Sequence, residues 1–229
     1  MPLCFGILAF PEVQQLDLTG PYEVFASAKE TEVHLIWKDR KPFLSSTHLS
    51  LTPTTTFADC PPLDVLCIPG GIGVNALLRD ETVLEFVREQ AMTARYVTSV
   101  CTGALVLGAA GLLKGRRATT HWNAHAFLAR FGALPTQGRV VKDGNLITAG
   151  GVTSGIDFGL AVIAELLGQT EAETIQLSLE YAPWPPFCSG TPEEASPAVL
   201  ESAKQRLARS RVERERILSG WPDGRPLIN

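Results

Sequence analysis

Short apolar runs alternate with helical patterns along the chain. Residues 3–10 form a continuous apolar run that ends at Pro11, and residues 63–68 form another. Continuous rather than alternating hydrophobicity is typical of a strand that is covered on both faces. Residues 82–91 carry apolar side chains at helical spacing before the next strand. This alternation predicts an α/β fold built on a doubly wound parallel sheet with helices on both faces.

The other elements follow from the same patterns. Further strands are expected over residues 33–37 and 96–100, with a short one over 118–120. An Asp-Gly pair between two extended runs predicts a hairpin over residues 140–148. The expected helices cover residues 19–28, 104–110, 123–131, 156–167, 171–181 and 198–218.

One domain with a helical extension is the expected organisation. The 229 residues are 45% hydrophobic, which is enough to bury a sizeable single core. We expect an α/β domain over residues 1–190 and a C-terminal helical extension, residues 191–229, packed on it. The helix at 198–218 mixes arginines with glutamates, so we expect it to present a solvated face.

Cys101 lies where a strand ending at Val100 meets a helix beginning near Ala104. A nucleophile on such a sharp turn is exposed above the sheet, and the turn needs small residues two places before and after it. Ser99 and Gly103 meet that need. The start of a helix also favours a thiolate. Cys101 is therefore predicted to be a reactive nucleophile on an elbow; the alternative is a buried cysteine that acts as a small hydrophobe.

Two further groups are expected beside this cysteine. Asp17 is expected in the loop between the first strand and its helix, and Gly70 and Gly71, followed by Ile72, form a turn that aims N–H groups outward. All of them follow core strands, so the fold brings them to one crevice with Cys101. There the acid would carry a proton and the backbone donors would stabilise negative charge. Asp17 could instead be only a helix N-cap.

The net charge and the cysteine content limit the kinds of binding partner and the cellular compartment that we expect. Twenty basic against 24 acidic residues give a net charge of −4, without the basic surface that nucleic acid or anionic membranes require. Five irregularly spaced cysteines without a zinc-binding pattern indicate free thiols in a reducing compartment. The amino terminus has no basic leader, and no apolar run approaches the ~20 residues that span a bilayer. We expect a cytoplasmic protein with a small-molecule partner.

Four motifs, taken in order, resemble the ThiJ/PfpI superfamily over about residues 3–190. They cover residues 16–21, 68–71, 99–104 and 117–122. The resemblance implies a flavodoxin-like fold and a homodimer. It also implies a cysteine nucleophile at Cys101, an acid hydrogen-bonded to it at Asp17, and Thr102 beside them.

Within the superfamily these residues most resemble the isocyanide hydratases. That resemblance implies hydration of isocyanides to N-substituted formamides through a covalent thioimidate, with no metal or organic cofactor. Thr102 stands where proteases and amidotransferases of the group carry histidine, and Asp17 stands where deglycase-like relatives carry glutamate. His121 is expected to line the crevice without acting as a base.

Gly150 introduces a helix near the same sheet edge, and with Val152 it is expected to let that helix move against Cys101. Two other functions stay open. A glyoxalase or deglycase acting on 2-oxoaldehydes would use the same thiol. A non-catalytic ligand or redox sensor would resemble the front half of AraC-type regulators, but their DNA-binding half needs roughly a hundred residues. After Tyr181, 48 residues remain (229 minus 181).

Overall fold

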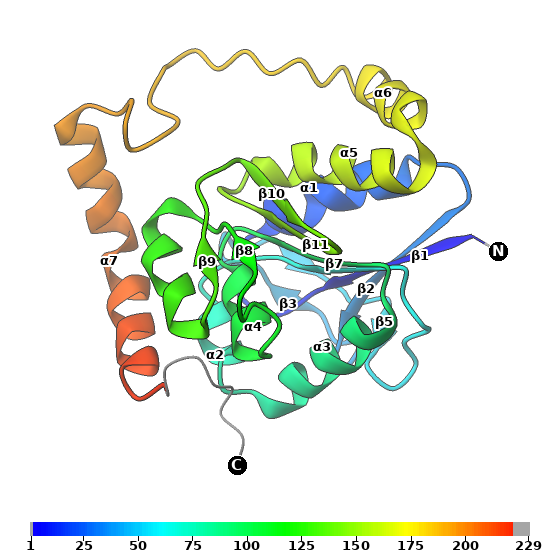
Figure 1. Ribbon diagram of the computed structural model, residues 1–229, viewed down its shortest axis with the longest axis horizontal. Helices are drawn as coiled ribbons and strands as arrows, with labels where there is room; N and C mark the ends of the chain where they lie inside the picture. Colours follow the sequence, from blue (N-terminus) through cyan, green and yellow to red (C-terminus); the bar gives the residue numbers. More distant parts are fainter. Residues whose placement is uncertain (1, 222–229) are drawn as a thin grey trace.

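A seven-stranded sheet in the order β10-β11-β7-β6-β1-β2-β5 forms the centre of the computed structural model, which describes residues 2–221 (Figure 1). Neighbouring strands are parallel except for the antiparallel pair β10–β11. Four strands make up its buried middle: β1 (Leu3–Leu8), β6 (Val65–Ile68), β7 (Tyr96–Val100) and β11 (Leu146–Ala149). The predicted doubly wound parallel sheet is confirmed.

The remaining strands lie at the edges or outside this sheet. The edge strands are β2 (Thr31–Trp37), β5 (Thr55–Thr56) and β10 (Val140–Asp143). A small antiparallel pair joins β3 (Phe43–Leu44) to β4 (Ser50–Leu51), and a parallel pair joins β8 (Arg117–Ala118) to β9 (Leu134–Pro135). The strand predicted over residues 118–120 was therefore placed too late and does not enter the main sheet.

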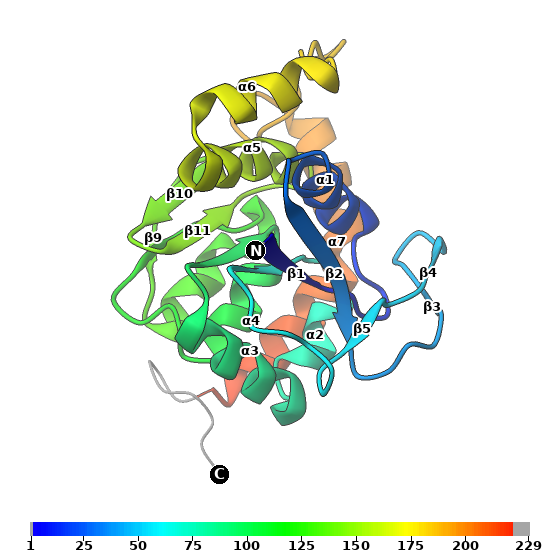
Figure 2. The same cartoon turned by 90° about the vertical axis from the view of Figure 1, so that its right-hand side faces the viewer.

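Helices cover both faces of the sheet (Figure 2). They are α1 (Gln15–Ala26), α5 (Ser154–Leu167) and α6 (Gln169–Ser178) on one side, and α2 (Val74–Leu77), α3 (Glu81–Thr93) and α4 (Gly103–Ala109) on the other. Helix α7 (Pro197–Ser219) stands beside one end of the sheet, at the left of Figure 1. The segment predicted as a helix over 123–131 is a 3₁₀ helix, η1 (Trp122–Phe131), which ends at Gly132 with φ of 70°. None of the helices described here is long and apolar enough to cross a membrane.

Helix α1 begins earlier than the sequence indicated. Its N-cap is Gln14, so Asp17 lies in the first helical turn rather than in the preceding loop, and Pro21 lies inside the helix. Proline favours the first turn, which is why the later start was predicted. The alternative role of Asp17 as an N-cap is wrong, and its buried carboxyl group bonds elsewhere.

Helix α7 is more than a solvated surface. Ser196 caps it, because its hydroxyl oxygen accepts the Val199 N–H at 3.4 Å. Asn75 of α2 then donates to the Ser210 carbonyl at 3.1 Å, which holds α7 against the body of the protein. Arg214 on the inner side is buried. The expectation of a solvated face is therefore wrong for this inner stripe, because a helix docked on other helices buries one side whatever its average charge.

The division of the chain at residue 190 stays a prediction. Met1 of the first part and residues 222–229 of the second lie outside the described residues.

Candidate active site

Cys101 lies on the predicted elbow between β7 and α4, with a φ of 54°. This is the left-handed region, which costs a non-glycine residue roughly 1–2 kcal/mol. Hydrogen bonds hold the residue there on both sides. Its N–H donates to the Ala149 carbonyl at 3.0 Å, and its carbonyl accepts the Thr120 hydroxyl at 2.6 Å. The surrounding structure therefore imposes the strained conformation that presents the thiol.

Gly103 explains why the elbow needs a small residue after the cysteine. A Cβ atom there would lie 2.0 Å from the Ile68 carbonyl oxygen at the end of β6. Any side chain would push α4 away from the sheet. The close approach of α4 to β6 therefore depends on glycine at this position.

Asp17 is fully buried behind the cysteine. Its Oδ2 accepts the Gly70 N–H at 2.9 Å. Its Oδ1 is buried and accepts no hydrogen bond of ordinary geometry from the described residues, so this oxygen is left for the Cys101 thiol, to which the carboxyl is coupled. Burial raises the pKa of Asp17 to about 7, although the Gly70 N–H and the Cys101 side chain oppose the change.

The pKa of the Cys101 thiol is raised as well. Burial, and then the neighbouring Asp17 charge, raise its pKa well above the ordinary value for cysteine, against the Thr102 backbone N–H. This direction opposes the thiolate that the helix start is expected to favour at Cys101. A helix dipole contributes about 0.3–1 kcal/mol, which is less than the cost of a buried anion beside a carboxylate. The two groups titrate as a coupled pair.

The glycine turn bonds inward. The Gly70 N–H donates to Asp17, and the Gly71 N–H donates to the Thr102 hydroxyl oxygen at 3.0 Å. The Thr102 hydroxyl in turn donates to the Gly71 carbonyl at 3.3 Å. The expectation that both glycine N–H groups point outward is therefore wrong. An antiparallel bridge between Val13 and Gly71 ties this turn to the segment before α1, and the Gln14 N–H donates to the Gly70 carbonyl at 2.8 Å.

A pocket of about 120 Å³ opens above the cysteine. Several predicted site residues line it together, whereas Asp17 and Gly70 lie behind its wall and Gly150 does not reach it. The lining consists of Gln14, Gly71, Ile72, Cys101, Thr102, His121, Asn123, Val152, Leu207, Ser210 and Arg214.

His121 lines this pocket as an uncharged ring. Burial, and then the charge of Arg214, lower its pKa to about 4. Its Nδ1 accepts the Asn123 N–H at 3.3 Å, so the ring proton of the neutral form is on Nε2. His121 can therefore donate a hydrogen bond at neutral pH but does not carry a charge.

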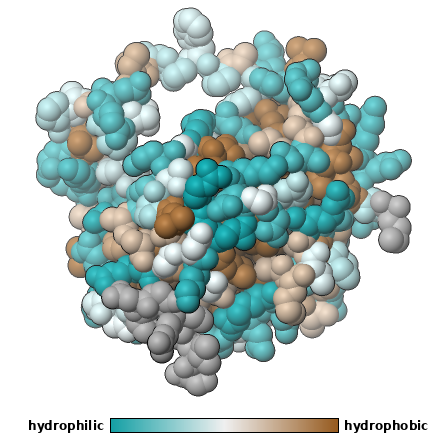
Figure 3. Space-filling view, in the orientation of Figure 1, coloured by the Kyte–Doolittle hydropathy of each residue, from teal (hydrophilic) through white to brown (hydrophobic). Residues whose placement is uncertain are grey.

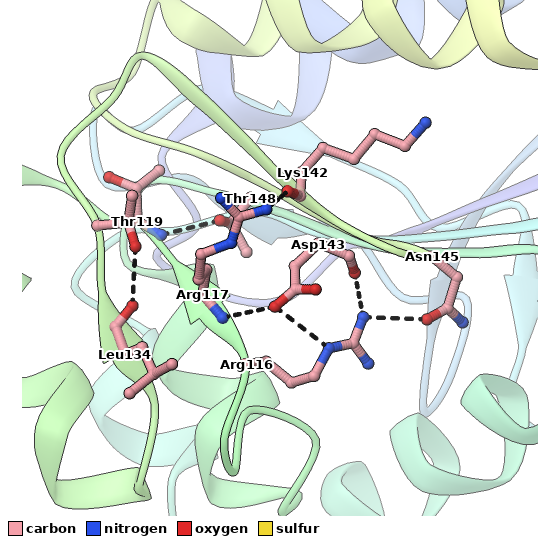
Figure 4. A network of polar contacts seen from close by, with 9 residues as sticks. Arg116, Arg117, Thr119, Leu134, Lys142, Asp143, Asn145 and Thr148 are labelled. Carbon is pink, nitrogen blue, oxygen red and sulfur yellow. Dashed lines mark hydrogen bonds and ion pairs between the residues drawn. The ribbon is translucent and has the colours of Figure 1, made fainter.

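The β10–β11 hairpin positions the segment that carries Thr120 and His121 (Figure 4). The Arg117 N–H donates to Asp143 Oδ2 at 2.7 Å, and the Thr119 N–H donates to Thr148 Oγ1 at 2.9 Å. The Arg116 guanidinium bonds the Asp143 carbonyl. Two of the site residues are thus held by strands that themselves stay outside the pocket.

Sequence reasoning missed one wall of the pocket. Leu207, Ser210 and Arg214 all come from α7, and their spacing of three and four residues puts them on one helix face. The spacing is present in the sequence, but the many charged residues of α7 made the whole helix look solvent-exposed. Gln14, the N-cap of α1, and Asn123, in the first turn of η1, were also missed, since neither carries a distinctive pattern. Within residues 2–221, no three histidine, cysteine or acidic side chains gather closely enough to hold a metal ion.

A cysteine elbow on a doubly wound sheet, with a buried acid behind it, is the architecture of a known family. The sequence profile of the DJ-1/PfpI family matches residues 6–165, and the chain belongs to that family. The predicted resemblance to the ThiJ/PfpI superfamily is confirmed.

Particular relatives extend this assignment. The chain is 60% identical over 210 residues to an isonitrile hydratase from Pseudomonas putida, covering 92% of each chain. It is similar to the crystal structure of a ThiJ/PfpI family protein from Pseudomonas syringae, with a TM-score of 0.92, 41% identity and coverage of 95% of this chain and 91% of that one. It is also 30% identical, over 59% of its length, to the HTH-type transcriptional regulator GbdR from Pseudomonas aeruginosa, of which it covers 37%.

Proposed function

We propose that this protein hydrates isocyanides to N-substituted formamides, with Cys101 as the nucleophile and Asp17 as the proton carrier. The isonitrile hydratase from Pseudomonas putida, 60% identical over most of both chains, supports the activity. The observation that carries the roles is the buried pair itself: Asp17 has one oxygen bonded to Gly70 and the other free for Cys101, at the base of a small pocket.

Isocyanide chemistry suits a thiol and an acid that share protons. The terminal carbon of an isocyanide accepts the nucleophile and then a proton, so both groups must address one atom. Cys101 and Asp17 come from different strand ends but are coupled to each other. The reactive form of the pair holds one proton, with a thiolate on Cys101 and a carboxylic acid on Asp17.

The first half-reaction forms the covalent intermediate. The Cys101 thiolate adds to the terminal carbon, and Asp17 transfers its proton to that carbon. The product is a thioimidate, R–N=CH–S–Cys101, and Asp17 is left as a carboxylate. The Thr102 hydroxyl and Gly71 hold the turn in place beside the reacting atoms.

The second half-reaction consumes water. Asp17 takes a proton from water as the oxygen adds to the thioimidate carbon, and passes that proton to the nitrogen. The C–S bond then breaks while the hydroxyl proton returns to Asp17. This releases the formamide, R–NH–CHO, and restores the thiolate and the acid. His121, whose ring proton is on Nε2, lines the same pocket and can donate a hydrogen bond to the new oxygen.

We propose that the helix that begins at Ser154 moves against Cys101 during these steps. Val152 lines the pocket just before it, and the Gly150 N–H donates to the Arg139 carbonyl at 2.9 Å. A Cβ atom at Gly150 would come no closer than 3.4 Å to another atom, so Gly150→Ala can fold. Unchanged rates of intermediate formation and hydrolysis in that variant, followed by stopped flow, would contradict the proposal.

Intact-protein mass spectrometry with a simple isocyanide tests the function. We expect a mass increase on wild-type protein that maps to Cys101, together with released formamide. Cys101→Ala should show neither, and Asp17→Asn should cut turnover by roughly 10²–10⁴-fold. Cys188→Ala is the matched control, because Cys188 is an exposed free cysteine. Full formamide production by Cys101→Ala would overturn the mechanism, and turnover of methylglyoxal alone would favour a glyoxalase.

The protein is proposed to work as a homodimer. Residues 179–196 run between α6 and α7 without helix or strand and border an opening visible in Figure 3. Trp184 on this segment is 93% exposed and Phe187 is 78% exposed, and large exposed apolar side chains favour a protein partner. We expect light scattering to give the mass of two chains, and Trp184→Ser with Phe187→Ser to weaken the pairing. A wild-type monomer at micromolar concentration would contradict this.

A cytoplasmic location completes the proposal. It is supported by five free cysteines, since reducing compartments keep thiols unpaired. A disulfide in protein isolated from its native cells under alkylating conditions would contradict it.

A further inference from the structure

Arg214 is a buried cation that forms no ion pair with another residue in the part of the chain that the structure describes. Its side chain is buried, with 3% of the residue exposed, although it belongs to a helix of mostly exposed charges. Its Nη2 donates to the Ser210 hydroxyl at 3.2 Å, and its guanidinium lies 5.9 Å from the centre of the Phe127 ring. Its Nε is buried and has no hydrogen-bond partner among the described residues.

Burial of an unpaired charge is costly, so its persistence needs a reason. A guanidinium removed from water costs several kcal/mol unless an anion compensates it. Arg211, one turn earlier, has such compensation, because its Nε bonds Glu215 at 2.9 Å. No acidic side chain within residues 2–221 forms an ion pair with Arg214. Cys101 and Glu213 are the described groups whose negative charge would stabilise the Arg214 cation, and neither forms an ion pair with it, so a ligand anion can complete its compensation.

The unpaired guanidinium belongs to the pocket above Cys101. Among the residues that line this pocket, Arg214 is the one with a permanent charge, and it shares the wall with apolar Leu207 and Val152. His121 is uncharged at neutral pH, because its pKa lies at about 4. The permanent charge of Arg214 at this wall favours an anionic group of a ligand beside it.

We propose that Arg214 forms a carboxylate-binding subsite and that the preferred substrates are small isocyanides with a carboxylate close to the isocyano group. This inference rests on the proposed function and names its substrate class. A carboxylate is the chemical match for a guanidinium, which presents its N–H groups in a planar fork. The pocket volume of about 120 Å³ suits a short link between the two groups. The carboxylate would also satisfy the buried Nε of Arg214.

A matched pair of substrates tests the subsite. Isocyanoacetate carries the carboxylate, and methyl isocyanoacetate has nearly the same shape without the charge. We expect wild-type protein to prefer isocyanoacetate in kcat/KM. Arg214→Met should lose roughly 10–100-fold on isocyanoacetate, the range for a hydrogen bond to a charged group, and less than about threefold on the ester. Arg214→Lys should keep part of the preference.

Arg209→Met is the control for a lost positive charge on α7, because Arg209 is exposed on the same helix. It should retain the wild-type preference. Binding supplies a second readout that needs no turnover: calorimetry should show N-formylglycine, the hydration product, binding to Cys101→Ala. That binding should be lost in Cys101→Ala with Arg214→Met, and thermal unfolding of each variant shows that it is folded.

The experiment distinguishes a failure of the proposed function from a failure of the carboxylate subsite. Wild-type protein that makes no formamide from either substrate overturns the proposed function and the substrate class with it. Wild-type protein that hydrates both substrates equally overturns the subsite alone. Equal losses on both substrates in Arg214→Met also overturn the subsite, and would mean that Arg214 acts on Cys101 instead.

Discussion

The Thr120 hydroxyl donates a hydrogen bond of 2.6 Å to the carbonyl oxygen of Cys101, joining two residues 19 positions apart in the chain. Both are buried. The bond fixes the peptide that follows a residue with a φ of 54°, and that conformation presents the thiol to the pocket. The segment 117–121 therefore acts on the nucleophile through the backbone.

Thr120→Val should weaken both stability and catalysis. Valine keeps the shape of threonine but leaves the buried Cys101 carbonyl without its donor, which costs about 1–3 kcal/mol. Denaturant unfolding measures the loss, and kcat should fall while the sheet content of the folded protein is unchanged. Thr174→Val is the control, since its exposed hydroxyl bonds a helix carbonyl at 2.7 Å and the change should stay within about 0.5 kcal/mol. Equal effects in both variants would contradict the role of Thr120.

The pH profile of hydration should rise through about pH 7. Burial raises the pKa of Asp17 to about 7 and raises that of Cys101 further, so the coupled pair loses its first proton near pH 7. The reactive form holds one proton and is absent at low pH. The profile of kcat/KM should therefore climb through pH 7 and then level off. Asp17→Asn should lose this rise, and a wild-type profile flat between pH 5 and 9 would contradict the shared proton.

The raised pKa of Asp17 also makes the stability of the protein depend on pH. Because the folded pKa of Asp17 lies above its ordinary value of 3.8, the native state holds this proton more tightly than the unfolded chain. The stabilisation that the protonated Asp17 gives the folded state is fully present below pH 4, and it is lost as pH rises toward 7. Denaturant unfolding of Asp17→Asn should lack that fall.

Gly70→Ala should disable the site without unfolding the protein. A Cβ atom at Gly70 would lie 2.6 Å from both the Thr102 nitrogen and Oγ1, and 2.8 Å from Asp17 Oδ2. The acid and Thr102 must move apart, and a misplacement of about 1 Å can cost roughly 10²-fold in rate. Gly190→Ala is the control, because nothing lies within 4 Å of its added Cβ. Wild-type turnover in Gly70→Ala would show that this packing is unimportant.

The elbow could be predicted because its determinants are local. A buried strand, a cysteine and a helix follow one another directly, and Ser99 and Gly103 are small where the turn is tight. Asp17 was placed at the correct sheet edge by the topology of parallel strands. Its hydrogen bond to Gly70, and therefore the inward direction of the turn, depends on a contact between distant segments. Such contacts leave no periodic pattern in the sequence.

The protonation of Cys101 and the position of Arg214 could not be predicted for a related reason. A helix start argues for a thiolate, but the opposing burial and carboxyl charge are properties of the folded site. Arg214 looks like one charge among many on α7, and its burial follows from the docking of α7 on α2 and η1. The composition of a helix predicts its average exposure and leaves open which single residue turns inward.

Arg214→Met should leave the free energy of unfolding unchanged or raise it by about 1–4 kcal/mol. Methionine keeps the apolar stem against Phe127 and removes a buried charge that has no ion pair among the described residues. The pKa of His121, which the Arg214 charge lowers, should rise from about 4 but stay below 6.5, because burial is the larger cause. Denaturant unfolding and NMR titration of the His121 ring measure the two effects, and Arg209→Met should produce neither. A marked loss of stability in Arg214→Met would mean that the guanidinium supports the fold rather than a ligand.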